Sequence, residues 1–300
     1  MSKKVVVITG ANSGLGLETA KHFLSKNDLV VMAVRDITKG EAAKEELLQL
    51  YPDGKIDVLY LDLAKLTTVR EFAAAFAKKY KAVDLLINNA GVMIPPYTKT
   101  AEGFELQFGA NHLGHFALTG LLLPLLEKGE HSRVVTLSSI AHRNGVIDFD
   151  NLDGSKGYKP MKFYSQSKLA NILFAKGLDE LLKQHGCKTI SLSAHPGISS
   201  TNLFRVGKDK TPWYIKPLMN LFAQSAEKGA LPTIMAATDK TLVGGEYIGP
   251  DGVGNRKGNP TIEVPHKKVY NKETMEKLWN VSEELTSISF DFQGNTQVTG

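Results

Sequence analysis

Short apolar runs alternate along the chain with longer segments in which apolar residues recur at helical spacing. The runs cover 5–9, 29–34, 56–61, 83–87, 134–138 and 189–194, and the helical patterns lie near 14–26, 38–50, 67–80, 103–127 and 165–185. This alternation of strands and helices predicts a mostly parallel sheet with helices on both faces. Runs such as Val5–Ile8 are continuously apolar, as expected for strands buried on both sides. The pattern therefore predicts an α/β fold with a doubly wound sheet.

Two segments interrupt this rhythm and are long enough to be functional loops. Residues 143–163 are rich in Gly, Asp, Asn and Lys, and residues 198–224 contain prolines and aromatic residues that break any regular pattern. We therefore predict a single domain over residues 1–286, with an insert at 143–163 and a substrate loop at 198–224.

The C-terminal part has a weaker pattern. Residues 250–268 are rich in Gly, Pro and Lys and are predicted to form a surface loop. Residues 272–285 fit an amphipathic helix. Residues 287–300 are mostly polar, so a polar tail is predicted there.

Composition narrows the functional classes. Hydrophobic residues make up 42% of the 300 residues and charged residues 22%, which is typical of a globular protein. The net charge of +5 is spread along the chain without an arginine-rich stretch, which argues against a nucleic-acid partner and is compatible with an anionic cofactor.

The cysteine content and the length of the first apolar run predict the cellular location. The single cysteine, Cys187, excludes an internal disulfide framework and a multi-cysteine zinc site. The first apolar run, Val5–Ile8, is far shorter than the roughly 20 residues that a membrane span needs. We therefore expect no membrane span, signal peptide or anchor, and a cytoplasmic location.

A glycine-rich segment, Thr9–Gly16, follows the first strand directly and opens a helix. Its glycines at positions 10, 14 and 16 let the chain turn sharply and bring backbone N–H groups and a helix N-terminus close to a pyrophosphate. A plain strand-to-helix turn is the alternative, but the position in the first βα unit favours a dinucleotide site. The predicted contacts are Gly10, Asn12, Ser13, Gly14, Leu15 and Gly16.

Arg35 ends the second strand, where an acidic residue would normally bind the 2′-hydroxyl of NAD. A guanidinium there suits the 2′-phosphate of NADP, and Ser13 could add a hydroxyl. Asp36 follows immediately and could instead bind the ribose, which would favour NAD, or cap the helix that begins near Thr38. We predict NADP(H) as the cofactor and keep the alternative open.

Tyr51, Tyr158 and Tyr164 each have a lysine four positions later, so context must choose among them. Turn residues or a proline interrupt the first two pairs. Tyr164 and Lys168 lead into a long apolar helical run and share one helix face. A tyrosine ordinarily has a pKa near 10, and a cation about 4 Å away could lower it by up to about three units. Lys168 is expected to have this effect on Tyr164.

These ordered parts resemble the short-chain dehydrogenase/reductase family, whose fold is of the Rossmann type. The resemblance rests on 9–16, Arg35, Asp62, 88–91, 111–116, 138–139, 164–168 and 196–197. The segment Asn111–Phe116 and the insert before Tyr164 are most similar to the branch that contains retinol dehydrogenases and protochlorophyllide reductases.

The resemblance implies a role for each matching residue. It assigns catalysis to Asn111, Ser139, Tyr164 and Lys168, with Ser139 chosen over Ser138 as the second serine of the pair. Asn111 is implied to hold a water that links the lysine to a proton relay, and Lys168 to hold the ribose. Further cofactor contacts are implied at Asp62, Leu63, Asn89, Ala90, Gly91, Tyr164, Lys168, Pro196, Gly197, Ile198 and Thr201.

The predicted function is hydride transfer between NADP(H) and an apolar alcohol or carbonyl compound. Aromatic and aliphatic residues of the substrate loop suggest the apolar substrate, although they could equally pack the loop; they are Phe204, Trp213, Tyr214, Leu218 and Phe222. His112 and His115 are interpreted as packing or cleft-lining residues, and no metal is expected.

An alternative function and an oligomeric state are also predicted. The alternative function is a non-catalytic NADP(H)-binding redox sensor, which would not need the reacting residues. The family's pairing of helices equivalent to 103–127 and 165–185 suggests a homodimer.

Overall fold

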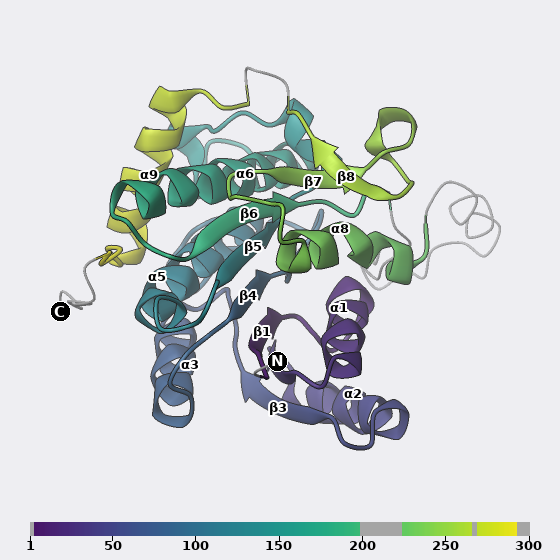
Figure 1. Cartoon of the computed structure of the whole chain (residues 1–300). Helices are drawn as coiled ribbons and strands as arrows, with labels where there is room; N and C mark the ends of the chain where they lie inside the picture. Colours follow the sequence, from purple (N-terminus) through teal and green to yellow (C-terminus); the bar gives the residue numbers. More distant parts are fainter. Residues whose placement is uncertain (1–2, 199–223, 266–268, 293–300) are drawn as a thin grey trace.

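The computed structural model describes residues 3–198, 224–265 and 269–292. Within them, one eight-stranded sheet has the order β3-β2-β1-β4-β5-β6-β7-β8, and only the β7–β8 pair is antiparallel (Figure 1). The strands are β1 Val5–Thr9, β2 Leu29–Val34, β3 Lys55–Tyr60, β4 Leu85–Asn88, β5 Arg133–Leu137, β6 Ile190–Ala194, β7 Tyr247–Pro250 and β8 Pro260–Glu263. The predicted doubly wound, mostly parallel sheet is confirmed.

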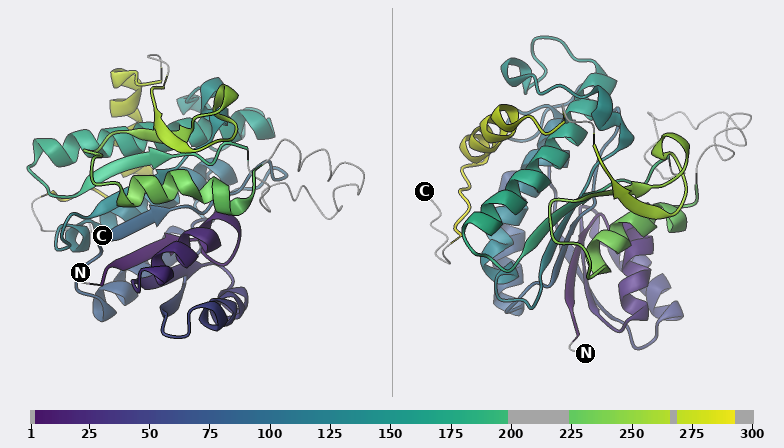
Figure 2. Two further views of the ribbon diagram at one scale, coloured as in Figure 1. Left: turned by 45° about the vertical axis from the view of Figure 1, so that its right-hand side comes forward. Right: turned by 45° about the horizontal axis from the view of Figure 1, so that its top comes forward.

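Helices cover both faces of this sheet. Helices α1, α2 and α8 lie on one face, and α3, α5 and α6 lie on the other (Figures 1 and 2). The helices are α1 Gly14–Ser25, α2 Ile37–Leu50, α3 Leu66–Lys79, α4 Leu106–Phe108, α5 Gly114–Leu126, α6 Pro160–Gln184, α8 Ala226–Thr238 and α9 Lys272–Thr286. Short turns of 3₁₀ helix lie at Ile140–Asn144, Phe149–Asn151 and Val253–Asn255.

The central strands explain why this sheet is the buried middle layer. Val7 and Leu86 belong to the apolar cluster under α5 and α6, whereas their neighbours Ile8 and Ile87 belong to the cluster under α1 and α8. Side chains of a strand alternate between the two faces, so both faces need apolar residues at every position. Burying each such side chain contributes about 1.5–3 kcal/mol.

The structure corrects the prediction for residues 250–268. This segment contains β8, which pairs antiparallel with β7. The strand has only four residues and begins at Pro260, so glycines, prolines and lysines around it dominate the local composition. Strand β8 ends the sheet, where proline is tolerated because its missing N–H faces no further strand.

The predicted helix at 103–127 is interrupted in the structure. Gly109–Leu113 forms a π-helical turn between α4 and α5. Such turns change which backbone carbonyls are bonded within the helix, and they often mark functional sites. Asn111 lies in the middle of this turn.

The predicted polar tail at 287–300 is wrong at its beginning. Ile288 and Phe290 are buried in the core cluster beneath α5, and a Cβ at Gly120 would come within 2.8 Å of Ile288 and 2.9 Å of Phe290. Two apolar residues among polar ones do not change the average composition, although they anchor the segment. Together with α9, this segment covers parts of α5 and α6, the helices expected to pair in a homodimer.

Replacing Phe290 with Ala should reduce the free energy of unfolding by about 3 kcal/mol, because a large buried side chain leaves a cavity. Its ring lies 4.9 Å from the Phe116 ring and 4.7 Å from the Trp279 ring. Urea denaturation would measure the loss. Val264→Ala is the control at an exposed site and should change stability by less than about 0.5 kcal/mol. Equal effects of the two substitutions would contradict the anchoring role of Phe290.

No helix in the part of the chain that the structure describes is both long enough and apolar enough to cross a bilayer.

Candidate active site

The glycine-rich turn after β1 has the conformation that its sequence predicts. Gly10 and Gly14 have φ values of 67° and 56°, which favour glycine. A Cβ at Gly16 would lie 2.6 Å from both Asn89 Nδ2 and the Gly10 carbonyl oxygen. The turn and the first residues of α1 can therefore pack this closely only with glycine at these positions.

Thr9 connects this turn to the segment after β4. Its hydroxyl oxygen accepts hydrogen bonds from the backbone N–H groups of Asn89 and Ala90, both at 2.9 Å. Asn89 Nδ2 donates to the Thr9 carbonyl oxygen at 2.7 Å. The sequence motif does not single out this role of Thr9, although the position of Thr9 at the end of β1 is a signal for it.

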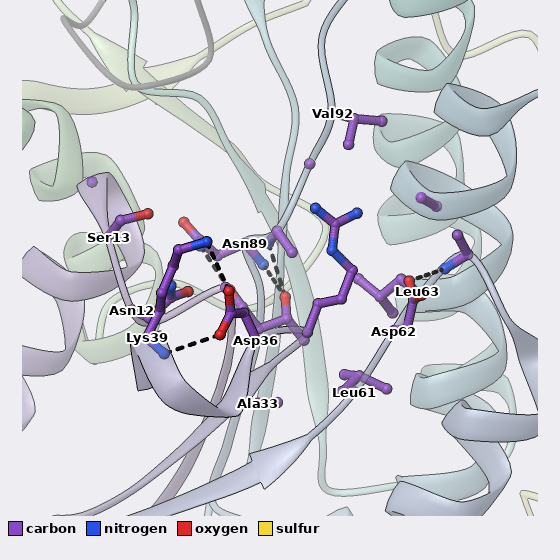
Figure 3. A pocket seen from close by; sticks show the side chains of 18 of the residues that line it. Asn12, Ser13, Ala33, Asp36, Lys39, Leu61, Asp62, Leu63, Asn89 and Val92 are labelled. Carbon is purple, nitrogen blue, oxygen red and sulfur yellow. Dashed lines mark hydrogen bonds and ion pairs between the residues drawn. The ribbon is translucent and has the colours of Figure 1, made fainter. Parts of the chain in front are cut away.

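A pocket lies at this edge of the sheet, where β1, β2 and β4 end (Figure 3). It gathers most of the predicted cofactor contacts, and its lining includes Gly10, Asn12, Ser13, Gly14, Leu15, Arg35, Asp62, Leu63, Asn89, Ala90 and Gly91. Gly16 lies beside the lining residue Asn89. The structure thus brings together residues from four separate parts of the sequence.

Lys39 also lines the pocket, although no sequence motif predicts a cofactor contact at this position. Asp36 caps α2 by accepting a hydrogen bond from the Lys39 backbone N–H, and its carboxylate lies 2.7 Å from Lys39 Nζ (Figure 3). Asp36 is therefore the N-cap of α2, which is one of the two alternative roles predicted for it. The spacing Asp36-x-x-Lys39 at a helix start was the available signal.

Tyr164 and Lys168 lie one turn apart near the start of α6. This helix begins at Pro160, earlier than predicted, because proline is tolerated in a first helical turn. Both side chains are almost fully buried, with 6% and 4% exposure. Lys168 Nζ donates to the Leu137 carbonyl oxygen at 3.2 Å and lies 5.8 Å from the centre of the Tyr164 ring. The pair is therefore held between α6 and the end of β5.

The electrostatics of this pair differ from the expectation. Burial raises the pKa of Tyr164, and a hydrogen bond with the Ser139 side chain opposes that rise. Burial also lowers the pKa of Lys168 to about 8. Desolvation is the largest cause of both shifts, and in the protein alone it outweighs any lowering of the Tyr164 pKa by Lys168.

The two serines after β5 have different surroundings. Ser138 Oγ donates to the Lys168 carbonyl oxygen at 2.7 Å and is buried in the structure. Ser139 Oγ accepts from the Ala141 N–H at 3.2 Å and also bonds with Tyr164. Ser138 thus fastens α6 to the sheet, whereas Ser139 is the serine beside the Tyr164 phenol.

Asn111 holds the segment that joins the pocket to this centre. Its Oδ1 accepts from the Val92 N–H at 2.7 Å, and its Nδ2 donates to the Val92 carbonyl oxygen at 2.9 Å. A Cβ at Gly91 would lie 3.4 Å from both Asn111 Oδ1 and Lys168 Nζ. Gly91 lines the pocket, so the predicted catalytic and cofactor residues are adjacent.

Both histidines of the Asn111–Phe116 segment are buried and uncharged. Burial lowers the pKa of His112 to about 3 and that of His115 to about 4. His115 Nδ1 lies 2.9 Å from the Asn111 carbonyl oxygen, so this nitrogen carries the proton, and His115 Nε2 lies 2.9 Å from Thr9 Oγ1. Among the described residues, no cluster of three potential metal ligands is found.

The segment Pro196–Ile198 follows β6 at the same edge of the sheet, next to the segment that carries Ser139. Thr201 and the five apolar residues assigned to substrate contact lie outside the described residues.

A model of the short chain dehydrogenase family matches residues 4–211. The chain belongs to this family. It is 39% identical over 289 residues to human "Retinol dehydrogenase 11", a match that covers 96% of this chain and 87% of that protein. It is 40% identical over 304 residues to mouse "Retinol dehydrogenase 14", with coverage of 96% and 87%.

This short-chain dehydrogenase also resembles a solved structure of an uncharacterized protein from Mycobacterium paratuberculosis. The TM-score is 0.81 at 40% identity, and the match covers 97% of this chain and 96% of that chain. These comparisons confirm the Rossmann-type fold and the resemblance to the retinol dehydrogenase branch. The protein is accordingly an oxidoreductase of the class that acts on alcohols and carbonyl compounds.

Proposed function

We propose that this short-chain dehydrogenase transfers a hydride between NADP(H) and an apolar alcohol or carbonyl compound, with Tyr164 as the proton-transferring residue. The observation that carries the proposal is the arrangement around Gly91. This glycine lines the pocket, and a Cβ at its position would lie 3.4 Å from both Asn111 Oδ1 and Lys168 Nζ. Lys168 stands one helical turn from Tyr164. Ser139 completes the site by its hydrogen bond with Tyr164.

The residues present fit a nicotinamide dinucleotide. Backbone N–H groups at the start of α1 and in the glycine turn suit a pyrophosphate. A residue larger than glycine at position 16 or 91 would place its Cβ against Asn89 or against Asn111 and Lys168, respectively. Asp62 and Leu63 would hold the adenine end, and Pro196–Ile198 would hold the nicotinamide end. When bound, the cofactor supplies or accepts the hydride.

The chain's own residues handle the proton. Tyr164 gives its phenolic proton to a substrate oxygen in the reduction and takes it back in the oxidation. Ser139 donates a hydrogen bond to that oxygen as charge develops on it. Lys168 is positively charged below its pKa of about 8 and stabilises the phenolate that remains. Asn111 holds Val92 and so fixes the wall of the site.

Two cations support NADP(H) over NAD(H). Arg35 and Lys39 are exposed residues that line the adenine end of the pocket, and both can bind a 2′-phosphate. Asp36 is already paired with Lys39 and caps α2. A ribose hydroxyl would therefore have to share the Asp36 carboxylate with the Lys39 ammonium group and backbone N–H.

Replacing Arg35 with Ala should weaken NADPH binding by about 10- to 100-fold, because a hydrogen bond to a charged group contributes about 1.5–3 kcal/mol. Lys39→Ala should have a smaller effect of the same sign. NADH binding should change little, since NADH lacks the phosphate. Fluorescence titration would measure both dissociation constants.

Lys44→Ala is the matched control for this titration. Lys44 lies on the same helix and pairs with Glu41, and it is not among the residues that line the pocket. An Arg35→Ala variant that loses NADH affinity as much as NADPH affinity would contradict a 2′-phosphate contact.

The proposed substrate class is based on the names of the similar proteins. Several are named retinol dehydrogenases, so their names indicate a long apolar alcohol. We therefore propose apolar alcohols and aldehydes, retinoids included, as the first substrates to test. The cytoplasmic location and the homodimer stay predictions.

The test of the function is a turnover assay. The protein is titrated with NADPH and NADH, and the absorbance of the reduced cofactor is then followed with a panel of apolar aldehydes, ketones and alcohols. Turnover with preferential use of NADPH would support the proposal. Tight cofactor binding without turnover of any compound would instead favour the redox-sensor alternative.

A further inference from the structure

Two loops of the proposed active site lie side by side at the carboxyl ends of neighbouring strands. Strand β5 leads into Ser139 and the 3₁₀ turn Ile140–Asn144, and β6 leads into His195 and the segment Pro196–Ile198. The proposed reaction needs the Ser139 hydroxyl and the nicotinamide end of the cofactor at a fixed separation. The two loops must therefore be held in fixed positions relative to each other.

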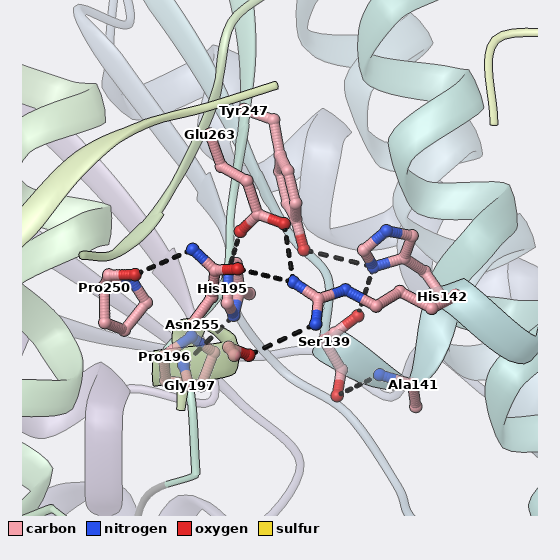
Figure 4. A network of polar contacts seen from close by, with 12 residues as sticks. Ser139, Ala141, His142, His195, Pro196, Gly197, Tyr247, Pro250, Asn255 and Glu263 are labelled. Atoms are coloured by element: carbon pink, nitrogen blue, oxygen red, sulfur yellow. Dashed lines mark hydrogen bonds and ion pairs between the residues drawn. The ribbon is translucent and has the colours of Figure 1, made fainter. Parts of the chain in front are cut away.

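Glu263, the last residue of β8, lies between these loops (Figure 4). Its Oε2 is 2.7 Å from His195 Nε2, and its Oε1 is 2.8 Å from Arg143 NH2. The Glu263 side chain is only 9% exposed. One carboxylate thus joins a residue of the loop after β6 to a residue of the loop after β5.

The His195 side of this bridge has a fixed tautomer. The Gly197 N–H donates to His195 Nδ1 at 3.1 Å, so Nδ1 is an acceptor and the proton lies on Nε2. His195 Nε2–H therefore donates to Glu263. The ring is fully buried, and a Cβ at Gly249 would overlap it. The imidazole can hardly move without breaking its contact with the Gly197 backbone.

The Arg143 side reaches Ser139 through the 3₁₀ turn. Arg143 NH2 also donates to Asn255 Oδ1 at 2.7 Å, and its NH1 donates to the Gly254 carbonyl oxygen at 3.1 Å. The preceding residue, His142, has its Nδ1 2.7 Å from the Ser139 carbonyl oxygen (Figure 4). The guanidinium therefore anchors the turn that begins at Ser139.

Tyr247 adds a packing contact between the same two loops. Its ring is stacked on His195 at 5.0 Å and meets His142 edge-on at 5.3 Å. The Tyr247 side chain is 1% exposed. Tyr247 therefore connects the two loops by ring contacts, in addition to the hydrogen bonds and ion pairs made by Glu263.

We propose that Glu263 is a positioning residue for the reaction, whose carboxylate fixes the loop carrying Ser139 relative to the loop carrying Pro196–Ile198. This inference rests on the proposed function. Glu263 does not touch the reacting atoms and acts through His195 and Arg143. A carboxylate is suited to this role because it accepts from two donors at once.

The charge state agrees with this role. Burial raises the pKa of Glu263, but the hydrogen bonds from His195 and Arg143 outweigh it and leave the pKa below its ordinary value. The group is therefore ionised at neutral pH. A glutamine of the same shape has one acceptor oxygen and one donor NH₂ group, so it can serve His195 or Arg143 but not both.

The first experiment compares Glu263→Gln with the wild-type enzyme in steady-state kinetics. We expect kcat to fall by about 10- to 100-fold, because small displacements of reacting groups cost factors of this size. The Kd for NADPH should change by less than about threefold, since the pocket for the adenine end is untouched. The KM for the substrate should change less than kcat, because the hydrogen bond from Ser139 strengthens as charge develops on the substrate oxygen. Arg143→Met should lower kcat similarly, and Arg143→Lys should restore part of it.

Asp179→Asn is the matched control for loss of a buried carboxylate. Asp179 is 1% exposed, pairs with Lys183 at 2.6 Å, and lies beside Ser191 at the beginning of β6, the end of the sheet opposite the site. It should destabilise the fold while leaving kcat within about twofold. If kcat is unchanged in Glu263→Gln, or falls only as in Asp179→Asn at equal loss of thermal stability, the proposal is wrong.

Amide hydrogen exchange of the cofactor-free protein gives an independent readout. The N–H groups of Gly197 and His142 are hydrogen-bonded within the two loops, and the Ile198 N–H donates to the Arg256 carbonyl oxygen in the segment between β7 and β8. They should exchange about tenfold faster in Glu263→Gln and at the wild-type rate in Asp179→Asn. Unchanged exchange would overturn the proposal. Should no compound be turned over by the wild-type protein, the proposed function fails, whereas the exchange rates still decide whether Glu263 holds the loops.

Discussion

Tyr164→Phe should lower kcat by about 10²- to 10⁴-fold, the range in which general acid–base catalysis contributes. The substitution removes one hydroxyl from a side chain that is 6% exposed, so the surrounding packing is kept. Dissociation constants for NADPH should stay within a few-fold of the wild-type value, because the pocket lining does not depend on that hydroxyl. Single-turnover absorbance measurements would separate the lost chemical step from binding.

Tyr51→Phe provides the matched control. Tyr51 also has a lysine four positions later, but it is the C-cap residue after α2 and packs, partly buried, against the apolar cluster on the other face of the sheet. Its substitution should leave kcat unchanged. A Tyr164→Phe variant with wild-type turnover would contradict the assignment of the proton-transferring residue, even if the cofactor binds as proposed.

The architecture could be predicted from the sequence because the central strands β1, β2 and β4 are almost continuously apolar. For β1 and β2 the predicted bounds, 5–9 and 29–34, match the structure. Strands β7 and β8 were not predicted, since each has four residues and lies among glycines and prolines. Short strands at the end of a sheet depend on their neighbours for stability, and that tertiary information is not visible in a local pattern.

The candidate site could be predicted from the sequence where a local motif fixes the spacing between functional residues. The glycines after β1 and the Tyr164–Lys168 pair belong to local patterns that determine which groups face one another. Glu263 has no such pattern: it is far in sequence from both His195 and Arg143, and only the β7–β8 pairing brings it to them. Residues that act by joining distant loops require the fold before they can be recognised.

Lys168 presents a conflict between function and stability. Its amine is buried at 4% exposure, and among the described residues Nζ makes one hydrogen bond, to the Leu137 carbonyl oxygen. Burial lowers its pKa from 10.5 to about 8. The folded protein therefore holds a charged amine at neutral pH in surroundings that disfavour the charge. A protein retains a destabilising buried charge of this kind where the reaction requires that charge.

Lys168→Met should consequently lower kcat by more than about 100-fold while making the cofactor-free protein more stable at pH 7 by about 1–3 kcal/mol. The upper value corresponds to the full pKa difference, and the lost hydrogen bond to Leu137 reduces it. Below the folded pKa of about 8 the cost of the charged amine is fully present. As the pH rises toward the unfolded value of 10.5, the unfolded chain binds more protons than the folded one, and the cost disappears.

Urea denaturation between pH 7 and pH 10 would therefore show the wild-type protein gaining stability relative to Lys168→Met, until the two curves approach each other. Lys176→Met is the control on the same helix, because Lys176 is 30% exposed and lies 3.4 Å from Glu180. It should shift stability by less than about 0.5 kcal/mol at either pH. A Lys168→Met protein that is less stable than wild type at pH 7 would mean that the buried amine is compensated by its surroundings, and the conflict inferred for this residue would not exist.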